Sequence, residues 1–190
     1  MAIGFYFDQT RCTGCRACQV ACKDKNRNEV GVIFRNAHTY SVGTFPEVSC
    51  YSYSASCNHC ETPACWAACP SGAIAKLDDG TVWINQELCT GEQLCVEACP
   101  YGIPQILPDG KAGKCDGCYA IRQAGGQPAC VAACPNRALD FGEIDELEAK
   151  YGSDLVSEIA ILPAASETNP NVRIKAKPAA SESNFVEVTW

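Results

Sequence analysis

Cysteine spacing constrains what this chain can fold into more than any other feature of its sequence. Fifteen of its 16 cysteines fall into four blocks, and each block ends in Cys-x3-Cys. Three thiolates on one tight loop can take three corners of an iron–sulfur cube, while a fourth, one helical turn later, ligates a neighbouring cluster. The pattern predicts four cubane-type clusters and electron transfer. The blocks are Cys12-x2-Cys15-x2-Cys18-x3-Cys22, Cys57-x2-Cys60-x4-Cys65-x3-Cys69, Cys89-x2-Glu92-x2-Cys95-x3-Cys99 and Cys115-x2-Cys118-x11-Cys130-x3-Cys134.

Two other uses of cysteine fit this spacing poorly. Disulfides form poorly between cysteines two residues apart, and the N-terminus lacks the basic region and long apolar segment of a secretory signal. Zinc sites use Cys-x2-Cys pairs, but they close at four ligands as two separated pairs and have no use for a third cysteine or for Cys-Pro. We therefore expect iron–sulfur clusters, without zinc or disulfides.

Exchange of the fourth cysteine between neighbouring clusters predicts how the ligands group. Blocks one and four then exchange ligands, as do blocks two and three, and we number the resulting sites I to IV. Site I comprises Cys12, Cys15, Cys18 and Cys134; site II comprises Cys22, Cys115, Cys118 and Cys130; site III comprises Cys57, Cys60, Cys65 and Cys99; site IV comprises Cys69, Cys89 and Cys95, with Glu92 at the fourth position.

The order of the blocks predicts an α+β fold of two ferredoxin-like modules, one nested in the other. Between Cys69 and Cys89 the sequence indicates two short strands joined by an Asp79-Gly80 turn, so residues 57–99 form the inner module. A strand at residues 3–7 and a matching stretch at 137–141 flank the outer blocks. The outer module is therefore expected to be split between residues 1–22 and 100–142.

The remaining segments carry no predicted cluster ligand. Residues 23–56 form an insertion with short strands, such as 48–53, and we expect its lone Cys50 to be a small buried hydrophobe. Residues 143–190 are expected to form a helix, marked by Ile144, Leu147 and Tyr151, and an extended tail. Because that tail is rich in proline, alanine and serine, we expect the chain from Leu162 onward to be disordered or to lie along a partner.

Other chemistry is hard to find in the sequence. A net charge of −7 with scattered cations argues against nucleic-acid binding, and no apolar run is long enough to span a bilayer. We see no nucleotide loop and no nucleophile paired with a histidine, and so predict no catalytic residue. His59 is expected to fill a loop or donate to a ligand, while Arg11, Arg16 and Lys114 are expected to be exposed.

The cysteine motifs resemble the four-cluster electron-transfer subunit of the dimethyl sulfoxide reductase-type molybdoenzyme family, over residues 5 to about 175. The long gap from Cys118 to Cys130 and the Asn58-His59 insertion do not occur together in simple ferredoxins. The motifs that carry the resemblance are Tyr-Phe-Asp-Gln-Thr-Arg-Cys-Thr-Gly-Cys, Ala-Cys-Lys-Asp, Ser-Cys-Asn-His-Cys-Glu-Thr-Pro-Ala-Cys, Ala-Cys-Pro-Tyr-Gly and Lys-Cys-Asp-Gly-Cys-Tyr.

This resemblance implies partners and a location. The chain would relay electrons between a larger subunit with a molybdenum or tungsten bis-pterin cofactor and a quinone-linked or other redox partner, with site I facing the catalytic subunit. It would be peripheral to the cytoplasmic membrane, held there by its partners and in some cases by a membrane anchor. The alternative is a free-standing polyferredoxin carrier, which needs neither the insertion nor the tail.

Glu92 replaces a cysteine without changing the spacing of its block, and three interpretations remain open. Site IV holds a [3Fe-4S] cluster that leaves Glu92 unbound, as in related nitrate reductase subunits with a bulky residue there. Alternatively, Glu92 ligates the fourth iron of a [4Fe-4S] cluster through oxygen. In the third interpretation, Glu92 is a solvated acid beside a cluster capped by water. The other three sites are expected to hold [4Fe-4S] clusters.

Overall fold

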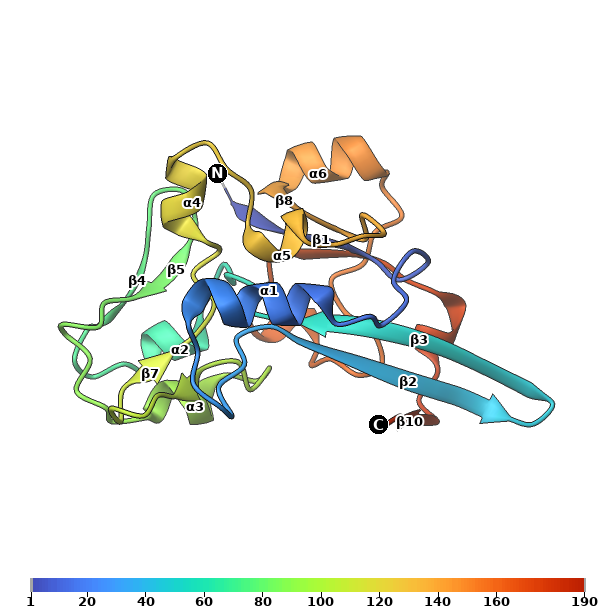
Figure 1. Ribbon diagram of the computed structural model, residues 1–190, viewed down its shortest axis with the longest axis horizontal. Coiled ribbons are helices and arrows are strands. Elements are labelled where there is room, and N and C mark those ends of the chain that lie inside the picture. Colours follow the sequence, from blue (N-terminus) through green and yellow to red (C-terminus); the bar gives the residue numbers. More distant parts are fainter. Residues whose placement is uncertain (1, 190) are drawn as a thin grey trace.

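The computed structural model describes residues 2–189, which form small sheets and short helices (Figure 1). Within this range, no helix combines the length and the apolar character needed to cross a membrane. The strands are β1 (Ile3–Asp8), β2 (Asn36–Thr44), β3 (Glu47–Ala55), β4 (Ile74–Lys76), β5 (Val82–Ile84), β6 (Gln105–Ile106), β7 (Ala112–Gly113), β8 (Leu139–Glu143), β9 (Val172–Lys175) and β10 (Phe185–Glu187). The helices are α1 (Ala17–Asn26), α2 (Ala64–Ala67), α3 (Leu94–Ala98), α4 (Tyr119–Gln123), α5 (Ala129–Ala132) and α6 (Ile144–Tyr151), with 3-10 turns η1 (Ala165–Glu167) and η2 (Pro178–Ser181).

The central sheet joins the two ends of the sequence. Strand β1 lies between β8, which runs antiparallel, and β9, which runs parallel. Every residue of β1 is buried, as its continuous apolar run requires of a central strand. At Gly4, a Cβ atom would come within 2.0 Å of the Asn171 carbonyl oxygen, so only glycine permits this close approach. The expected strands at residues 3–7 and 137–141 are thus confirmed as partners, although β8 begins two residues later.

The insertion forms a long hairpin that projects from the body. Strands β2 and β3 pair antiparallel, and β10 pairs with the other edge of β2 (Figure 1). The inner half of β3, which includes Tyr51 and Tyr53, is buried, whereas residues 47–50 are exposed. Cys50 lies in this exposed half, so the expectation of a buried hydrophobe is wrong.

Two predicted local elements are confirmed. Strands β4 and β5 pair across the turn that contains Asp79 and Gly80, and Gly80 has the positive φ of 88° that such a turn favours. Helix α6 buries Ile144 and Leu147 and ends at Tyr151, and the capping residue Gly152 has a φ of 103°.

The C-terminal segment departs from expectation, because it folds onto this chain's own body. Val172 and Ile174 of β9 are 3% and 0% exposed, and Ala180 in η2 is fully buried. The prolines at positions 163, 170 and 178 lie outside the strands, so they limit strand length without preventing strands. Alternating apolar residues in Val-Arg-Ile-Lys supply the buried face of β9. The expected disorder is therefore incorrect, whereas contact of this segment with a partner stays a prediction.

Candidate iron–sulfur sites

The structure brings the cysteines of three predicted sites around three cavities. One cavity is lined by all four cysteines of site III, and another by all four of site I. A third is lined by the three cysteines of site IV together with Glu92. The 16 cysteines, all within residues 2–189, form no disulfide bond. Among residues 2–189, no three His, Cys, Asp or Glu side chains converge closely enough to hold a single metal ion.

The four cysteines of site II lie close together in the core. Cys22 reaches them from α1, while the other three come from the segment around α4 and α5. Burial, followed by the charges of the neighbouring thiolates, raises the pKa of Cys22 to about 12. Those neighbours are Cys115, Cys130 and Cys118.

Hydrogen bonds to the Asp8 carboxylate hold the loop that enters site I. The buried Asp8 carboxylate accepts hydrogen bonds from the Thr10 backbone N–H at 2.8 Å and from the Thr10 hydroxyl at 2.5 Å. Burial works to raise the pKa of Asp8, but these hydrogen bonds and those from Tyr6 and Arg11 hold it below its ordinary value. The Gly14 N–H then points to the Cys12 sulfur at 3.5 Å. Asp8 therefore supports the turn that presents the first ligands.

The loop that carries Glu92 has the backbone conformation of the loop that carries Cys15. Thr13-Gly14-Cys15-Arg16 and Thr90-Gly91-Glu92-Gln93 are equivalent four-residue stretches. Their glycines have φ of 69° and 79°, and the residues that follow Cys15 and Glu92 both have φ of 62°. Each loop leads directly into a helix, α1 or α3. Glu92 thus lies where a cysteine would lie, exposed at the rim of the site IV cavity.

Lys114 is buried against site III, contrary to the expectation that it is exposed. Only 7% of Lys114 is accessible, and its ammonium donates to the Cys57 sulfur at 3.4 Å. Burial raises the pKa of Cys57, but the charge of Lys114 and the contacts with His59 outweigh it and lower that pKa to about 5. Arg11 and Arg16, by contrast, are exposed as expected.

Arg35 is a site residue that the sequence did not reveal. It is 1% exposed, and its Nη1 donates to the Ser54 carbonyl at 2.9 Å and to the Ser54 hydroxyl at 3.0 Å. The Ser54 hydroxyl is in turn 3.3 Å from the Cys18 sulfur. Burial works to lower the pKa of Arg35, but the thiolates of sites I and II raise it above its ordinary value. No cysteine motif surrounds Arg35 in the sequence, so only the fold places it here.

Unpartnered donors provide a test of whether these residues fit iron–sulfur clusters. The buried Nε and Nη2 atoms of Arg35 and Nε2 of His59 have no hydrogen-bond partner among residues 2–189. Because His59 Nδ1 accepts the Val82 backbone N–H at 3.1 Å, the neutral ring carries its proton on Nε2. Buried donors without acceptors are costly, and both side chains lie beside cysteines. Sulfur atoms of bound clusters would supply the acceptors, so the donor set fits.

Comparison with known proteins agrees with this chemistry. The 4Fe-4S dicluster domain family matches residues 48–144, and the 4Fe-4S binding domain family matches residues 4–24. The B subunit of anaerobic dimethyl sulfoxide reductase from Escherichia coli K12 is 46% identical over 181 residues, covering 90% of this chain and 87% of the relative. Its counterpart in Haemophilus influenzae is 46% identical over 182 residues, covering 90% and 88%. Protein NrfC of Escherichia coli K12 is 41% identical over 150 residues, covering 75% and 66%.

Proposed function

Because the chain belongs to the family of iron–sulfur electron-transfer subunits that includes the B subunit of dimethyl sulfoxide reductase, we propose that it relays single electrons through four clusters. The electrons pass between a molybdenum or tungsten bis-pterin catalytic subunit and a quinone-linked or other redox partner. The observation that carries this proposal is the grouping of 15 cysteines and Glu92 into four sets, three of them lining cavities. Bound clusters would each supply a one-electron couple.

The proposed ligands are the residues of sites I to IV. The protein's own contribution is to fix these thiolates, to exclude water and to point N–H groups at sulfur. The Gly117 backbone N–H donates to the Cys115 sulfur at 3.4 Å. The Ala138 backbone N–H donates to the Cys134 sulfur at 3.2 Å. Such hydrogen bonds, with burial, set cluster potentials within the roughly −700 to +450 mV that protein clusters span.

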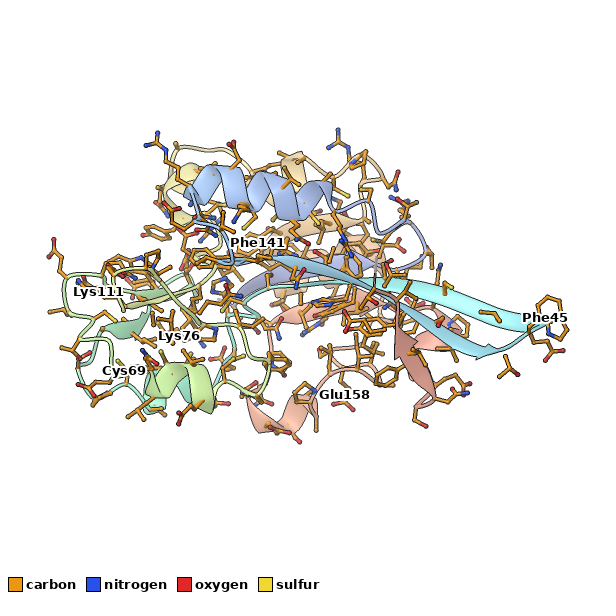
Figure 2. The ribbon with its side chains drawn as sticks, turned by 60° about the horizontal axis from the view of Figure 1, so that its bottom comes forward. Phe45, Cys69, Lys76, Lys111, Phe141 and Glu158 are labelled. Carbon is orange, nitrogen blue, oxygen red and sulfur yellow. The ribbon has the colours of Figure 1, made fainter. Side chains whose placement is uncertain are left out.

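Contacts between sites support a linear order from I to IV. Arg35 lies beside cysteines of both sites I and II, and Lys114 lies beside cysteines of both sites II and III. Cys65 of site III on α2 and Cys95 of site IV on α3 share one apolar core. Cys69 of site IV lies at the opposite end of the long axis from Phe45 at the hairpin tip (Figure 2). We propose that electrons enter or leave at site IV and that site I faces the catalytic subunit.

The ligand exchange between blocks leads us to propose two nested modules. Residues 57–99 form the inner one and residues 1–22 with 100–142 the outer one, with 23–56 and 143–190 as additions. The pairing of β1 with β8 supports this organisation. We further propose that partner subunits hold the chain at the cytoplasmic membrane.

For site IV we propose a [3Fe-4S] cluster on Cys69, Cys89 and Cys95. The preserved loop conformation supports a position for Glu92 at the vacant corner of that cluster. A carboxylate also ligates iron, so a Glu-ligated [4Fe-4S] cluster is the second proposal, and a solvated Glu92 the third. Magnetic resonance of the oxidised protein separates the first proposal from the other two, since only a [3Fe-4S] cluster gives a three-iron signal.

Iron and sulfide analysis of anaerobically prepared protein tests the cofactor count. Three [4Fe-4S] clusters and one [3Fe-4S] cluster predict about 15 irons per chain, and four complete cubes predict about 16. Two clusters or fewer in fully loaded protein would refute the ligand assignment. Purification through a tag on this chain should also retain a larger subunit with bound molybdenum or tungsten. A chain that is fully loaded but isolated alone would instead support the free-standing carrier.

A further inference from the structure

Two cations, Lys114 and Arg35, are buried between neighbouring cluster sites. They are the buried lysine and arginine side chains of residues 2–189. Lys114 follows strand β7 and directly precedes Cys115, whereas Arg35 directly precedes strand β2. The two side chains therefore reach the interior from different segments of the fold.

The contacts of Lys114 are those of a lysine ammonium group. Its Nζ donates to the Val82 carbonyl, to the Cys115 carbonyl at 3.1 Å and to the Cys57 sulfur at 3.4 Å. These three acceptors match the three donor hydrogens of an ammonium. Cys57 belongs to site III and Cys115 to site II, and Lys114 therefore lies at the junction of these two sites.

Arg35 occupies the corresponding position between sites I and II. Its guanidinium carbon lies 4.2 Å from the centre of the Phe5 ring, and Ser54 connects its Nη1 to Cys18 of site I. The nitrogens Nε and Nη2 have no acceptor within residues 2–189, and the thiolates of Cys130 and Cys115 in site II lie nearby. A guanidinium stays protonated in proteins, so this junction also holds a full positive charge.

Neither cation has a carboxylate partner. In the described chain, residues 2–189, the ion pairs between basic side chains and Asp or Glu involve neither Arg35 nor Lys114. A buried charge without a counter-charge is strongly unfavourable. The thiolates and the clusters they would hold are the negative groups in reach, so these cations are placed to balance cluster charge.

We propose that Lys114 and Arg35 are internal counter-cations of the electron path, and that each raises the reduction potentials of the two clusters it separates. This inference rests on the proposed function. An added electron makes a cluster more negative, and a buried cation favours that state with little solvent screening. Lys114 acts on sites II and III, and Arg35 on sites I and II. Site IV gains no buried cation from the described residues and carries the acidic Glu92, so the charges favour electrons at sites I to III over site IV.

Redox titration followed by magnetic resonance tests this assignment on the cluster-loaded protein, isolated anaerobically with its accompanying subunits. Lys114→Gln removes the charge and keeps a hydrogen-bond donor, Lys114→Arg keeps the charge, and Arg35→Gln removes the other charge. The matched control is Arg16→Gln, which removes an exposed cation next to Cys15.

We expect Lys114→Gln to lower two of the four potentials by at least 59 mV each, a tenfold change for a one-electron couple. Arg35→Gln should also lower two, and one cluster, that of site II, should shift in both variants. Lys114→Arg and Arg16→Gln should each shift none of the four potentials by as much as 59 mV.

Unchanged potentials in a fully loaded Lys114→Gln protein would overturn the proposal, as would an equal shift of all four clusters. If Lys114→Gln and Lys114→Met both lose the clusters of sites II and III, Lys114 is a structural support and the proposal is also overturned. If iron and sulfide analysis shows that the parent protein does not hold four clusters, the proposed function is refuted instead.

Discussion

Replacing Ile174 by alanine tests whether the C-terminal segment belongs to the core of this chain. Ile174 is 0% exposed on β9, beside Phe7 of β1, and it packs in the main apolar core. Its backbone N–H donates to the Val156 carbonyl at 2.8 Å, a bond that the substitution leaves intact. The loss is therefore one of side-chain packing. Truncating a fully buried isoleucine to alanine costs about 2–5 kcal/mol.

The cost converts into a measurable change in thermal unfolding. For a domain of this size, 1 kcal/mol shifts the midpoint by about 2–4 °C, so Ile174→Ala should lower it by about 4–20 °C. Cluster absorbance reports the transition, at one scan rate because loss of clusters makes unfolding irreversible. Val186→Ala in β10 is the control, since Val186 is 64% exposed in the same segment. If the two variants unfold at the same temperature, β9 does not contribute to the core as described.

Two other substitutions test the candidate sites. Glu92→Cys should convert site IV to an ordinary [4Fe-4S] cluster with a lower potential, because the cluster type changes and a thiolate donates more electron density than a carboxylate. An identical magnetic resonance spectrum and potential in parent and variant would make Glu92 a bystander. Asp8→Asn should cost about 1–3 kcal/mol, since the amide nitrogen that replaces Oδ2 cannot accept from the Tyr6 hydroxyl, and a neutral amide oxygen accepts from Thr10 and Arg11 more weakly than a carboxylate does. We expect site I to lose iron first in that variant under air, whereas the exposed Asp78→Asn control should lose iron at the parental rate.

Features encoded by nearby residues could be predicted from the sequence. The 4Fe-4S chemistry, the β4–β5 hairpin and helix α6 each depend on residues a few positions apart, where spacing is visible directly. The grouping of cysteines into sites followed from a ligand-exchange rule, and it stays a prediction until iron is measured.

Features that depend on tertiary contacts could not be predicted. Lys114 is buried because the fold brings it to Cys57, which is 57 positions away, and a lysine next to a cysteine gives no sign of this. Arg35 lies in a stretch without motifs. Cys50 follows the alternation of a buried strand, but its half of the hairpin projects beyond the body and is exposed. The proline-rich composition of the C-terminal segment concealed the short apolar alternation of β9, which suffices because β1 offers an open edge.

The central position of β1 has a consequence for biosynthesis. Strand β1 is translated before both of its neighbours, and it can pair only after Leu139–Glu143 and Val172–Lys175 have been made. The ligand set of site I is also completed late, because Cys134 is translated long after Cys12. The residues of sites III and IV, in contrast, all lie between positions 57 and 99. Since proteins are made from the N-terminus, we expect sites III and IV to be loaded with metal before site I, which must wait for Cys134.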